Sequence, residues 1–366
     1  MQTIQTKPTV RLMPPSPLAE KTWVAEDFLL QKRFALPAPG ILLLIACMQP
    51  QPIDEVIQDV AQRLSLSPER VERVVQSLLT KELLVATLSE DVRRFNEIAR
   101  QWQSLGWIEA AEYHLATYNY QFLGADEEGR YLTQQRMIHY NNNEEDTNRI
   151  KTYPGASVHI PLPRPDADLL PVAPGDAWSR QVASRKFDAE MLSVIASLAF
   201  GKVGTIKTPQ LQWNGQPAIH RTSPSGGARH PTEAYVVIID VPPLQPGWYH
   251  IAIDSPQLEL LHEGRVEPAR LEELFPTSYG RAPFSVAAIV ILTSIFERNM
   301  WRYREPRTFR TIHMDAGHLA ESVQMLAQAI GVRAFIQYWA NENAIEEQLG
   351  LHYLDEGFLL SIALGQ

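Results

Sequence analysis

The first part of the chain carries apolar residues at helical spacing. Residues 53–64 and 69–81 each place their apolar side chains on one face of a helix. Ser67 is an N-cap before the second helix, whose first residue is proline. The apolar run 41–48 predicts an earlier helix, and residues 83–88 read as a short strand. Three helices and a wing-like strand are typical of a winged-helix module.

A second domain starts near Trp178 and alternates strand-like with helical runs. The expected strands are 233–240, 247–253, 287–293 and 357–365, and the expected helices are 191–200, 311–330 and 342–349. Asp188 is the expected N-cap of the first helix. The run 287–293 is apolar throughout, as in a strand buried on both faces. Because no GxGxxG or P-loop motif occurs, we do not expect a Rossmann dinucleotide site.

The remaining segments connect these two regions. A helix is expected near 92–105, and residues 113–122 alternate like a half-buried strand, with His114 as a structural hydrogen-bonding residue. Residues 161–175 are rich in proline and predict an extended linker. The expected parts are a flexible arm at 1–18, a winged-helix-like module binding a peptide or partner at 19–90, a connecting region and linker at 91–177, and the second domain at 178–366.

Composition restricts the classes of partner. The chain has 366 residues, of which 45% are hydrophobic and 20% charged, as in soluble globular proteins. A formal net charge of −9 argues against a nonspecific nucleic-acid binder, which needs a basic field. The helix 69–81 has no basic surplus. We therefore expect its module to bind peptide or protein rather than DNA, or to be a structural appendage.

The lone cysteine, Cys47, lies inside the apolar run 41–48. It has no partner for a disulfide within the chain and belongs to no metal-ligand cluster, so we expect a core position. The run is too short to span a bilayer, and no signal-peptide pattern precedes it. These features predict a cytoplasmic protein without a membrane partner.

A glycine-containing loop is the first candidate for chemistry. It reads Ser223, Pro224, Ser225, Gly226 and Gly227, and a strand-like run follows shortly after it. Adjacent glycines let the backbone approach a flat ligand closely, because no Cβ intervenes. The two serines are short donors that can reach a polyol or a phosphate. Taken alone, the same residues also suit an ordinary hairpin turn.

Further motifs accompany this loop in a fixed order. They are Ser-Arg-Lys-Phe at 184–187, Pro-Ser-Gly-Gly-Ala-Arg-His-Pro at 224–231, Trp-Arg-Tyr at 301–303 with Arg307 and Arg310, Asp-Ala-Gly-His at 315–318, and Gly-Leu at 350–351. With these motifs, residues 178–366 resemble the nitroreductase-like flavoproteins, specifically their SagB-type branch, the azoline dehydrogenases of modified-peptide biosynthesis. The resemblance implies an α+β fold with a mixed sheet wrapped by helices, and a homodimer with FMN at the subunit interface.

The resemblance also implies roles for particular residues in binding FMN. Arg185 would offer its planar fork to the flavin pyrimidine edge or to the phosphate. The family often carries an arginine and a serine shortly before this position, where this chain has Val182 and Ala183. Arg180 or Ser184 would then take their place. The loop from Ser223 to Gly227 would cradle the ribityl chain and the ring edge.

The active-site Lys-Tyr of the azoline dehydrogenases corresponds to Arg302 and Tyr303. Arginine does not deprotonate and cannot be a general base. By analogy, Tyr303 would remove the proton α to the carbonyl of a thiazoline or oxazoline, and hydride would pass to flavin N5. Arg302 would favour the ionised tyrosine and orient the substrate carbonyl, and molecular oxygen would reoxidise the flavin. A plain surface or core role for the Arg-Tyr pair is an open alternative.

The implied partners are a peptide or carrier-bound peptidyl substrate and a cyclodehydratase or synthetase. Modules that resemble the N-terminal one grip leader peptides or the cyclodehydratase in peptide-modifying enzymes. One alternative is an NAD(P)H-dependent reductase of nitro, quinone or alkene compounds on the same fold. Another is a catalytically inactive scaffold that binds a peptide or partner. A winged-helix transcription factor is disfavoured by the acidic charge balance.

Overall fold

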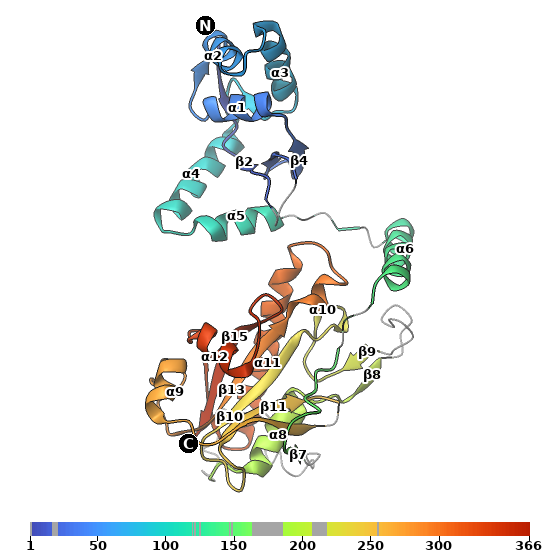
Figure 1. The fold of residues 1–366 in the computed structure, drawn as a ribbon, viewed down its shortest axis with the longest axis vertical. Coiled ribbons are helices and arrows are strands. Elements are labelled where there is room, and N and C mark those ends of the chain that lie inside the picture. Colours follow the sequence, from blue (N-terminus) through green and yellow to red (C-terminus); the bar gives the residue numbers. More distant parts are fainter. Residues whose placement is uncertain are drawn as a thin grey trace. The chain divides into compact units, whose positions relative to one another are not determined.

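The computed structural model divides into two compact units, residues 1–122 and 123–366, drawn in Figure 1. The described residues are 2–16, 21–118, 120, 122–123, 126–145, 147, 149–162, 186–206, 218–254 and 256–366. No helix among them has the length and apolar content that crossing a membrane requires.

The N-terminal unit contains the expected helices. They are α1 (Ala38–Ala46), α2 (Ile53–Leu64), α3 (Pro68–Thr80) and α4 (Glu90–Ser104), and an unexpected helix, α5 (Ile108–Thr117), follows them. One sheet has the order β5 (Gln51–Pro52), β1 (Thr3–Thr6), β6 (Leu84–Val85), and the other has the order β2 (Val10–Met13), β3 (Val24–Asp27), β4 (Lys32–Ala35). Cys47 is fully buried in the core of this unit, as predicted, and burial raises its pKa to about 11. The three helices and the short strand at 84–85 are therefore confirmed.

The flexible arm expected at residues 1–18 is wrong. Its residues form β1 and β2, and Ile4 is 1% exposed in the core. Lys7 and Thr9, polar in sequence, are buried because both bind the Asp27 carboxylate, at 2.8 and 2.9 Å. Polar residues that find partners inside a fold cannot be distinguished by composition from those of a mobile end.

The strand expected at 113–122 is also wrong, because α5 occupies most of it. Trp102 of α4 packs its ring against Trp107 and against His114, with centroids 5.7 and 5.6 Å apart. Glu112 meets Arg11 at 3.5 Å, and the Leu115 carbonyl accepts from Gln31. These contacts hold α4 and α5 in the N-terminal unit, whereas the sequence had suggested a separate connecting region.

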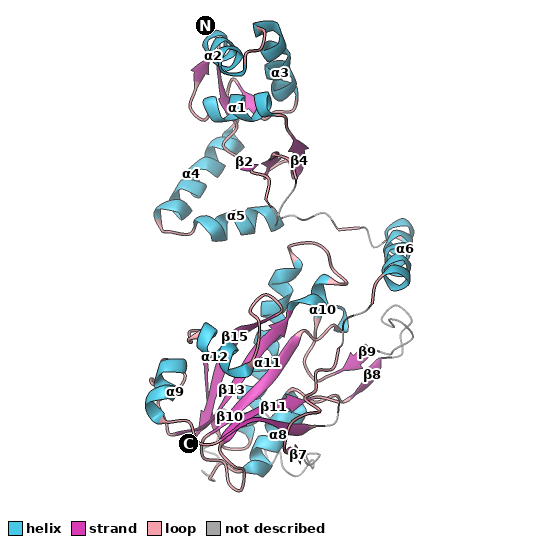
Figure 2. Ribbon diagram, viewed as in Figure 1, coloured by secondary structure: helices cyan, strands magenta, loops and turns pink. Residues whose placement is uncertain are grey.

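The second unit is a seven-stranded sheet covered by helices (Figure 2). Its strand order is β14 (Arg333–Gln337), β15 (Glu356–Gly365), β13 (Val286–Ile295), β10 (Thr232–Ile238), β11 (Gly247–Ala252), β12 (Gln257–Glu263), β7 (His159–Pro161). Its helices are α6 (Glu127–Asn143), α8 (Ala189–Ala199), α9 (Pro268–Leu274), α10 (Phe296–Met300), α11 (Thr308–Ala329) and α12 (Glu342–Leu349). A hairpin of β8 (Gly204–Ile206) and β9 (Ala218–His220) lies beside the sheet.

Successive side chains of β10 point to opposite faces of the sheet, and different helices cover the two faces. Val236 belongs to the core formed with α8 and α11, and Val237 to the core formed with α9 and α12. Asp188 caps α8 as predicted, accepting from the Met191 amide at 3.0 Å. The α+β class is confirmed. All six pairings of the sheet are antiparallel, however, so the expected mixture with parallel pairings is not seen among the described strands. Hairpins join β10, β11 and β12, which accounts for part of this pattern.

Candidate active site

The loop between β9 and β10 turns tightly at the predicted glycines. Gly227 has a φ of +61°, and a Cβ built there would lie 2.2 Å from the Tyr303 hydroxyl oxygen. Only glycine therefore allows Tyr303 to lie this close to the loop. Ala228 and His230 also have left-handed backbone, with φ of 52° and 47°. Left-handed non-glycine residues are uncommon and often occur at functional sites.

Both predicted serine donors of the loop face α11. Ser225 Oγ donates to Asp315 Oδ2 at 2.6 Å and accepts from the His230 amide at 2.9 Å. Ser223 Oγ lies 2.8 Å from Ser322 Oγ, which donates its own hydrogen to the His318 carbonyl. The hydrogen between the two serines must therefore come from Ser223. Their cofactor-binding role remains a prediction, now limited to their oxygen lone pairs and backbone groups.

Asp315 determines which part of a cofactor the loop can accept. Its Oδ2 also accepts from the Gly226 amide at 3.3 Å, and burial raises the pKa of this carboxyl. A buried carboxylate beneath the loop disfavours a second anion beside it. The Gly227 amide has no hydrogen-bond partner among the described residues and is available to a ligand acceptor. The loop therefore fits a neutral polar edge, such as that of a flavin ring, better than a phosphate.

Arg302 and Tyr303, the predicted catalytic pair, are both half-buried. The Arg302 guanidinium carbon lies 4.9 Å from the centroid of the Tyr303 ring, within the range of a cation–π contact. Both backbone amides donate to the Asn299 carbonyl, at 3.1 and 2.8 Å. Burial lowers the pKa of Arg302, but arginine stays charged at working pH. The pair and Gly227 thus form one cluster.

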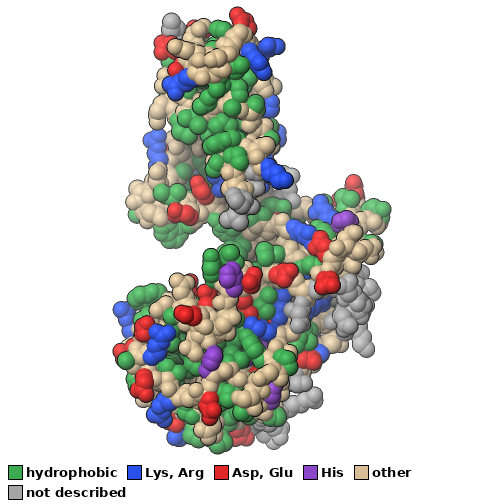
Figure 3. Space-filling view, in the orientation of Figure 1, with side chains coloured by type: hydrophobic (Ala, Val, Ile, Leu, Met, Phe, Trp, Pro, Cys, Tyr) green, Lys and Arg blue, Asp and Glu red, His purple; other side chains and the backbone are tan. Residues whose placement is uncertain are grey.

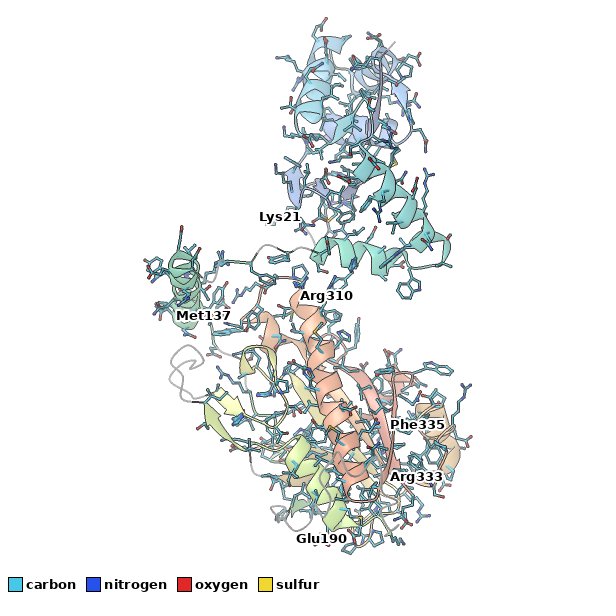
Figure 4. All side chains as sticks on the ribbon, turned by 180° about the vertical axis from the view of Figure 1, so that it is seen from behind. Lys21, Met137, Glu190, Arg310, Arg333 and Phe335 are labelled. Carbon is cyan, nitrogen blue, oxygen red and sulfur yellow. The ribbon has the colours of Figure 1, made fainter. Side chains whose placement is uncertain are left out.

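The helix α6 contacts the residues on either side of this pair. Met137 and Tyr140 pack against Trp301, which is 5% exposed. The Arg304 guanidinium lies 3.9 Å from the Tyr140 ring centroid and pairs with Glu144 at 2.5 Å. Met137, which packs against Trp301, can be found on α6 in Figure 4, where Arg310 marks the first turn of α11.

The remaining residues of interest are the other predicted cofactor-binding residues and one buried carboxylate that the sequence analysis did not single out. Arg180, Ser184 and Arg185 lie outside the described residues, so their roles stay predictions. Pro224 is exposed on the loop. The sequence did not single out Glu233, which is fully buried and accepts from His250 Nε2 at 3.0 Å. A charged residue at the start of the apolar run of β10 was the available signal.

Parts of the chain are similar to known proteins. The chain is 34% identical over 137 residues to the trifolitoxin-processing protein TfxB of Rhizobium leguminosarum bv. trifolii, covering 36% of each chain. It is 30% identical over 118 residues to MJ1384 of Methanocaldococcus jannaschii, described as a nitroreductase, covering 31% of this chain and 54% of that protein. The alignments thus span well under two thirds of these relatives.

The fold and the family agree with the motifs. A solved structure from Anabaena variabilis, described as a nitroreductase, matches 70% of this chain and 45% of its own with a TM-score of 0.50 and 24% identity. A sequence model of the nitroreductase family matches residues 179–366. The predicted resemblance to nitroreductase-like proteins is confirmed, and one of the relatives is named for the processing of trifolitoxin. Since the family match covers half of the chain, the protein belongs to the nitroreductase family.

Proposed function

We propose that this protein is an FMN-dependent dehydrogenase that oxidises a thiazoline or oxazoline in a peptide or peptidyl precursor. The observation that carries the proposal is the seating of Tyr303 against Gly227 with Arg302 over its ring, inside a nitroreductase-family domain. When bound, FMN supplies the acceptor for two electrons. The Gly227 amide would hold its neutral ring edge, while Arg180, Ser184 and Arg185 are the candidates for its phosphate.

Tyr303 is the candidate general base. Its phenolic oxygen takes the proton α to the carbonyl of the azoline ring, and the adjacent carbon gives up hydride, so that the ring loses two hydrogens and becomes aromatic. The Arg302 guanidinium packs over the Tyr303 ring in a cation–π contact, which fixes the ring, and it can orient the substrate carbonyl. Trp301 and α6 support the backbone that carries this pair.

The peptide substrate is inferred from two features outside this cluster. The similarity to the trifolitoxin-processing protein supports a role in the processing of a natural product. Hydrophobic side chains also gather on the face of the N-terminal unit seen in Figure 3, and Leu105 and Trp107 of this unit are 70% and 60% exposed. A leader peptide, cyclodehydratase or synthetase would bind this unit, and the 123–366 unit would form a homodimer.

The first experiment is the visible absorption spectrum of the purified protein, with identification of the flavin released by heat. Synthetic peptides carrying one azoline are then incubated with the flavin-loaded enzyme, and mass spectrometry follows the loss of two hydrogens. Tyr303→Phe should retain FMN and lose turnover. Tyr279→Phe, which removes the hydroxyl of a tyrosine packed against the core formed with α9 and α12, is the matched control and should retain turnover. Unchanged turnover in Tyr303→Phe would refute Tyr303 as the base.

A second candidate is an NAD(P)H-dependent reductase of nitro, quinone or alkene compounds. It is favoured by the family match and by the relative described as a nitroreductase. Steady consumption of NAD(P)H with a generic quinone, and no mass change in any azoline peptide, would establish it over the dehydrogenase. A colourless protein that cannot be loaded with FMN but binds a leader peptide would instead indicate a scaffold.

A further inference from the structure

Two buried arginines join the glycine loop to α10 in both directions. From α10, Arg298 Nη1 donates to the His230 carbonyl at 3.0 Å and pairs with Glu233 Oε1 at 2.5 Å. From the loop, Arg229 Nε donates to the Arg298 carbonyl at 2.5 Å. Both arginines are completely buried, and so is the Glu233 side chain. We call Arg229, Glu233 and Arg298 the arginine clasp.

The arginine clasp fixes the backbone of the glycine loop at His230, which has an unfavourable left-handed conformation. His230 is left-handed, yet its amide donates to Ser225 Oγ, its carbonyl accepts from Arg298, and its ring Nε2 lies 3.1 Å from the Ile219 carbonyl. Unfavourable backbone persists only where the surroundings fix it from several sides. The clasp therefore acts on the same loop whose Gly227 contacts Tyr303.

The charges of the clasp are fixed by a histidine between two carboxylates. His250 Nε2 lies 3.0 Å from Glu233 and Nδ1 lies 2.8 Å from Glu259. Ionised carboxylates only accept, so both ring nitrogens carry protons and His250 is an imidazolium. Burial by itself raises the pKa of Glu233, but Arg298 and His250 outweigh it and hold that pKa at about 2. Glu233 is thus an anion between Arg298 and His250, and Arg221 is a third cation that lowers its pKa.

Arg298 of the arginine clasp is connected to Tyr303 through the next residue of α10, Asn299. Asn299 follows Arg298 in α10, and its carbonyl accepts from the Tyr303 amide at 2.8 Å. We propose that Glu233, acting through Arg298, is a positioning residue that seats the Tyr303 hydroxyl against Gly227. The consequence for turnover rests on the proposed function, in which Tyr303 is the base. The effect on the position of Tyr303 is independent of the proposed function.

The direct test places 3-fluorotyrosine at position 303 alone and records its ¹⁹F resonance in the full chain. Gly227→Ala provides the reference for a displaced ring, because its Cβ excludes the hydroxyl. Glu233→Gln should move the resonance to, or broaden it toward, that reference. Glu259→Gln is the matched control, because Glu259 is 1% exposed, lies on the other side of the same imidazole, and accepts hydrogen bonds from His250, the Tyr153 amide and Gln257. It should lower thermal stability and leave the resonance in place.

An unmoved resonance in folded Glu233→Gln, or an equal shift in Glu259→Gln, would overturn the proposal. If Glu233→Gln does not fold, Arg298→Lys replaces it, since lysine keeps the positive charge but replaces the planar guanidinium, whose Nη1 both pairs with Glu233 and donates to the His230 carbonyl, by a tetrahedral ammonium group. Arg298→Lys should move the ¹⁹F resonance of residue 303 in the same way, and an unmoved resonance in this variant would also refute the proposal. Restoration of the wild-type resonance in Glu233→Asp would support positioning by charge.

Turnover separates this proposal from the proposed function. In the azoline assay, Glu233→Gln should lower kcat about 100-fold, as expected for a misplacement of about 1 Å, with KM and FMN affinity little changed. If Tyr303→Phe keeps full turnover while Glu233→Gln still moves the fluorine resonance, the proposed function fails and the positioning role stands. If Tyr303→Phe is inactive and Glu233→Gln shows wild-type kcat and resonance, the reverse holds.

Discussion

Replacing Gly227 by alanine tests whether the loop and Tyr303 form one site. The added Cβ would lie 2.2 Å from the Tyr303 hydroxyl oxygen, 3.0 Å from Cζ and 3.2 Å from Cε2. No real Cβ tolerates the first distance, so Tyr303 must leave its position. The same residue has a φ of +61°, which costs an L-residue about 1–2 kcal/mol. Reduced entropy of the unfolded chain offsets about 0.4–1 kcal/mol of this.

The net expectation is a loss of about 1 kcal/mol in the free energy of unfolding, in addition to any packing lost by Tyr303. Gly226→Ala is a control one residue away. A Cβ there would meet only Thr311, at 3.7 and 3.8 Å, and the backbone is not left-handed. Its free energy of unfolding should stay within about 0.5 kcal/mol of wild type.

Urea unfolding of both variants, with a crystal structure of Gly227→Ala, is the assay. The alanine at 227 should be the less stable variant, with Tyr303 moved off the loop and turnover of the azoline peptide lost. Equal stability of the two variants with Tyr303 unmoved would refute the close packing on which the site is built.

Two further predictions concern a titrating group and a helix. Burial lowers the pKa of His230 to about 3, so the stability it contributes is present above its ordinary pKa of 6.5 and is lost as pH falls toward 3. His230→Asn, which tolerates left-handed backbone, should therefore reduce the loss of urea stability between pH 7 and pH 4, and an unchanged slope would contradict this. Trp301→Ala should cost about 3–5 kcal/mol and release its partners Met137 and Tyr140. Limited proteolysis should then cut α6 faster, and wild-type cleavage rates would show that α6 does not depend on Trp301.

The sequence predicts the elements of the fold well where periodicity is strong. The helix 342–349 has the predicted ends, and the apolar run 287–293 is the middle of β13. Prediction failed at residues 3–6 and 113–117, where burial depends on partners distant in the chain. Ile4 is buried by helices that follow it, and α5 is held by Arg11 and Gln31. Local pattern carries no information about such contacts.

For the candidate site, too, some residues could be predicted from the sequence, whereas their contacts could not. The two glycines could be singled out because adjacent glycines are a local signal, and Tyr303 because the family resemblance places the active-site pair at 302–303. That Ser225 gives its hydrogen to Asp315, 90 residues away, could not. This contact uses the serine donor that a polyol or a phosphate would need, and leaves the ring edge, which the resemblance also implied, as the ligand that the loop fits best. Hydrogen-bond donors are easy to identify in a sequence, but the acceptor that uses them is a property of the tertiary structure.

Stability alone does not account for the buried charges beside the site. Desolvating Glu233 and Arg298 costs free energy that their attraction barely recovers, and apolar residues of similar volume often serve stability as well or better. What the ion pair adds is position: one nitrogen of Arg298, Nη1, both pairs with the Glu233 carboxylate and donates to the His230 carbonyl. An apolar contact would tolerate rotation of α10, and with it displacement of Tyr303. We therefore attribute the pair to the geometry of the site, at some expense of stability.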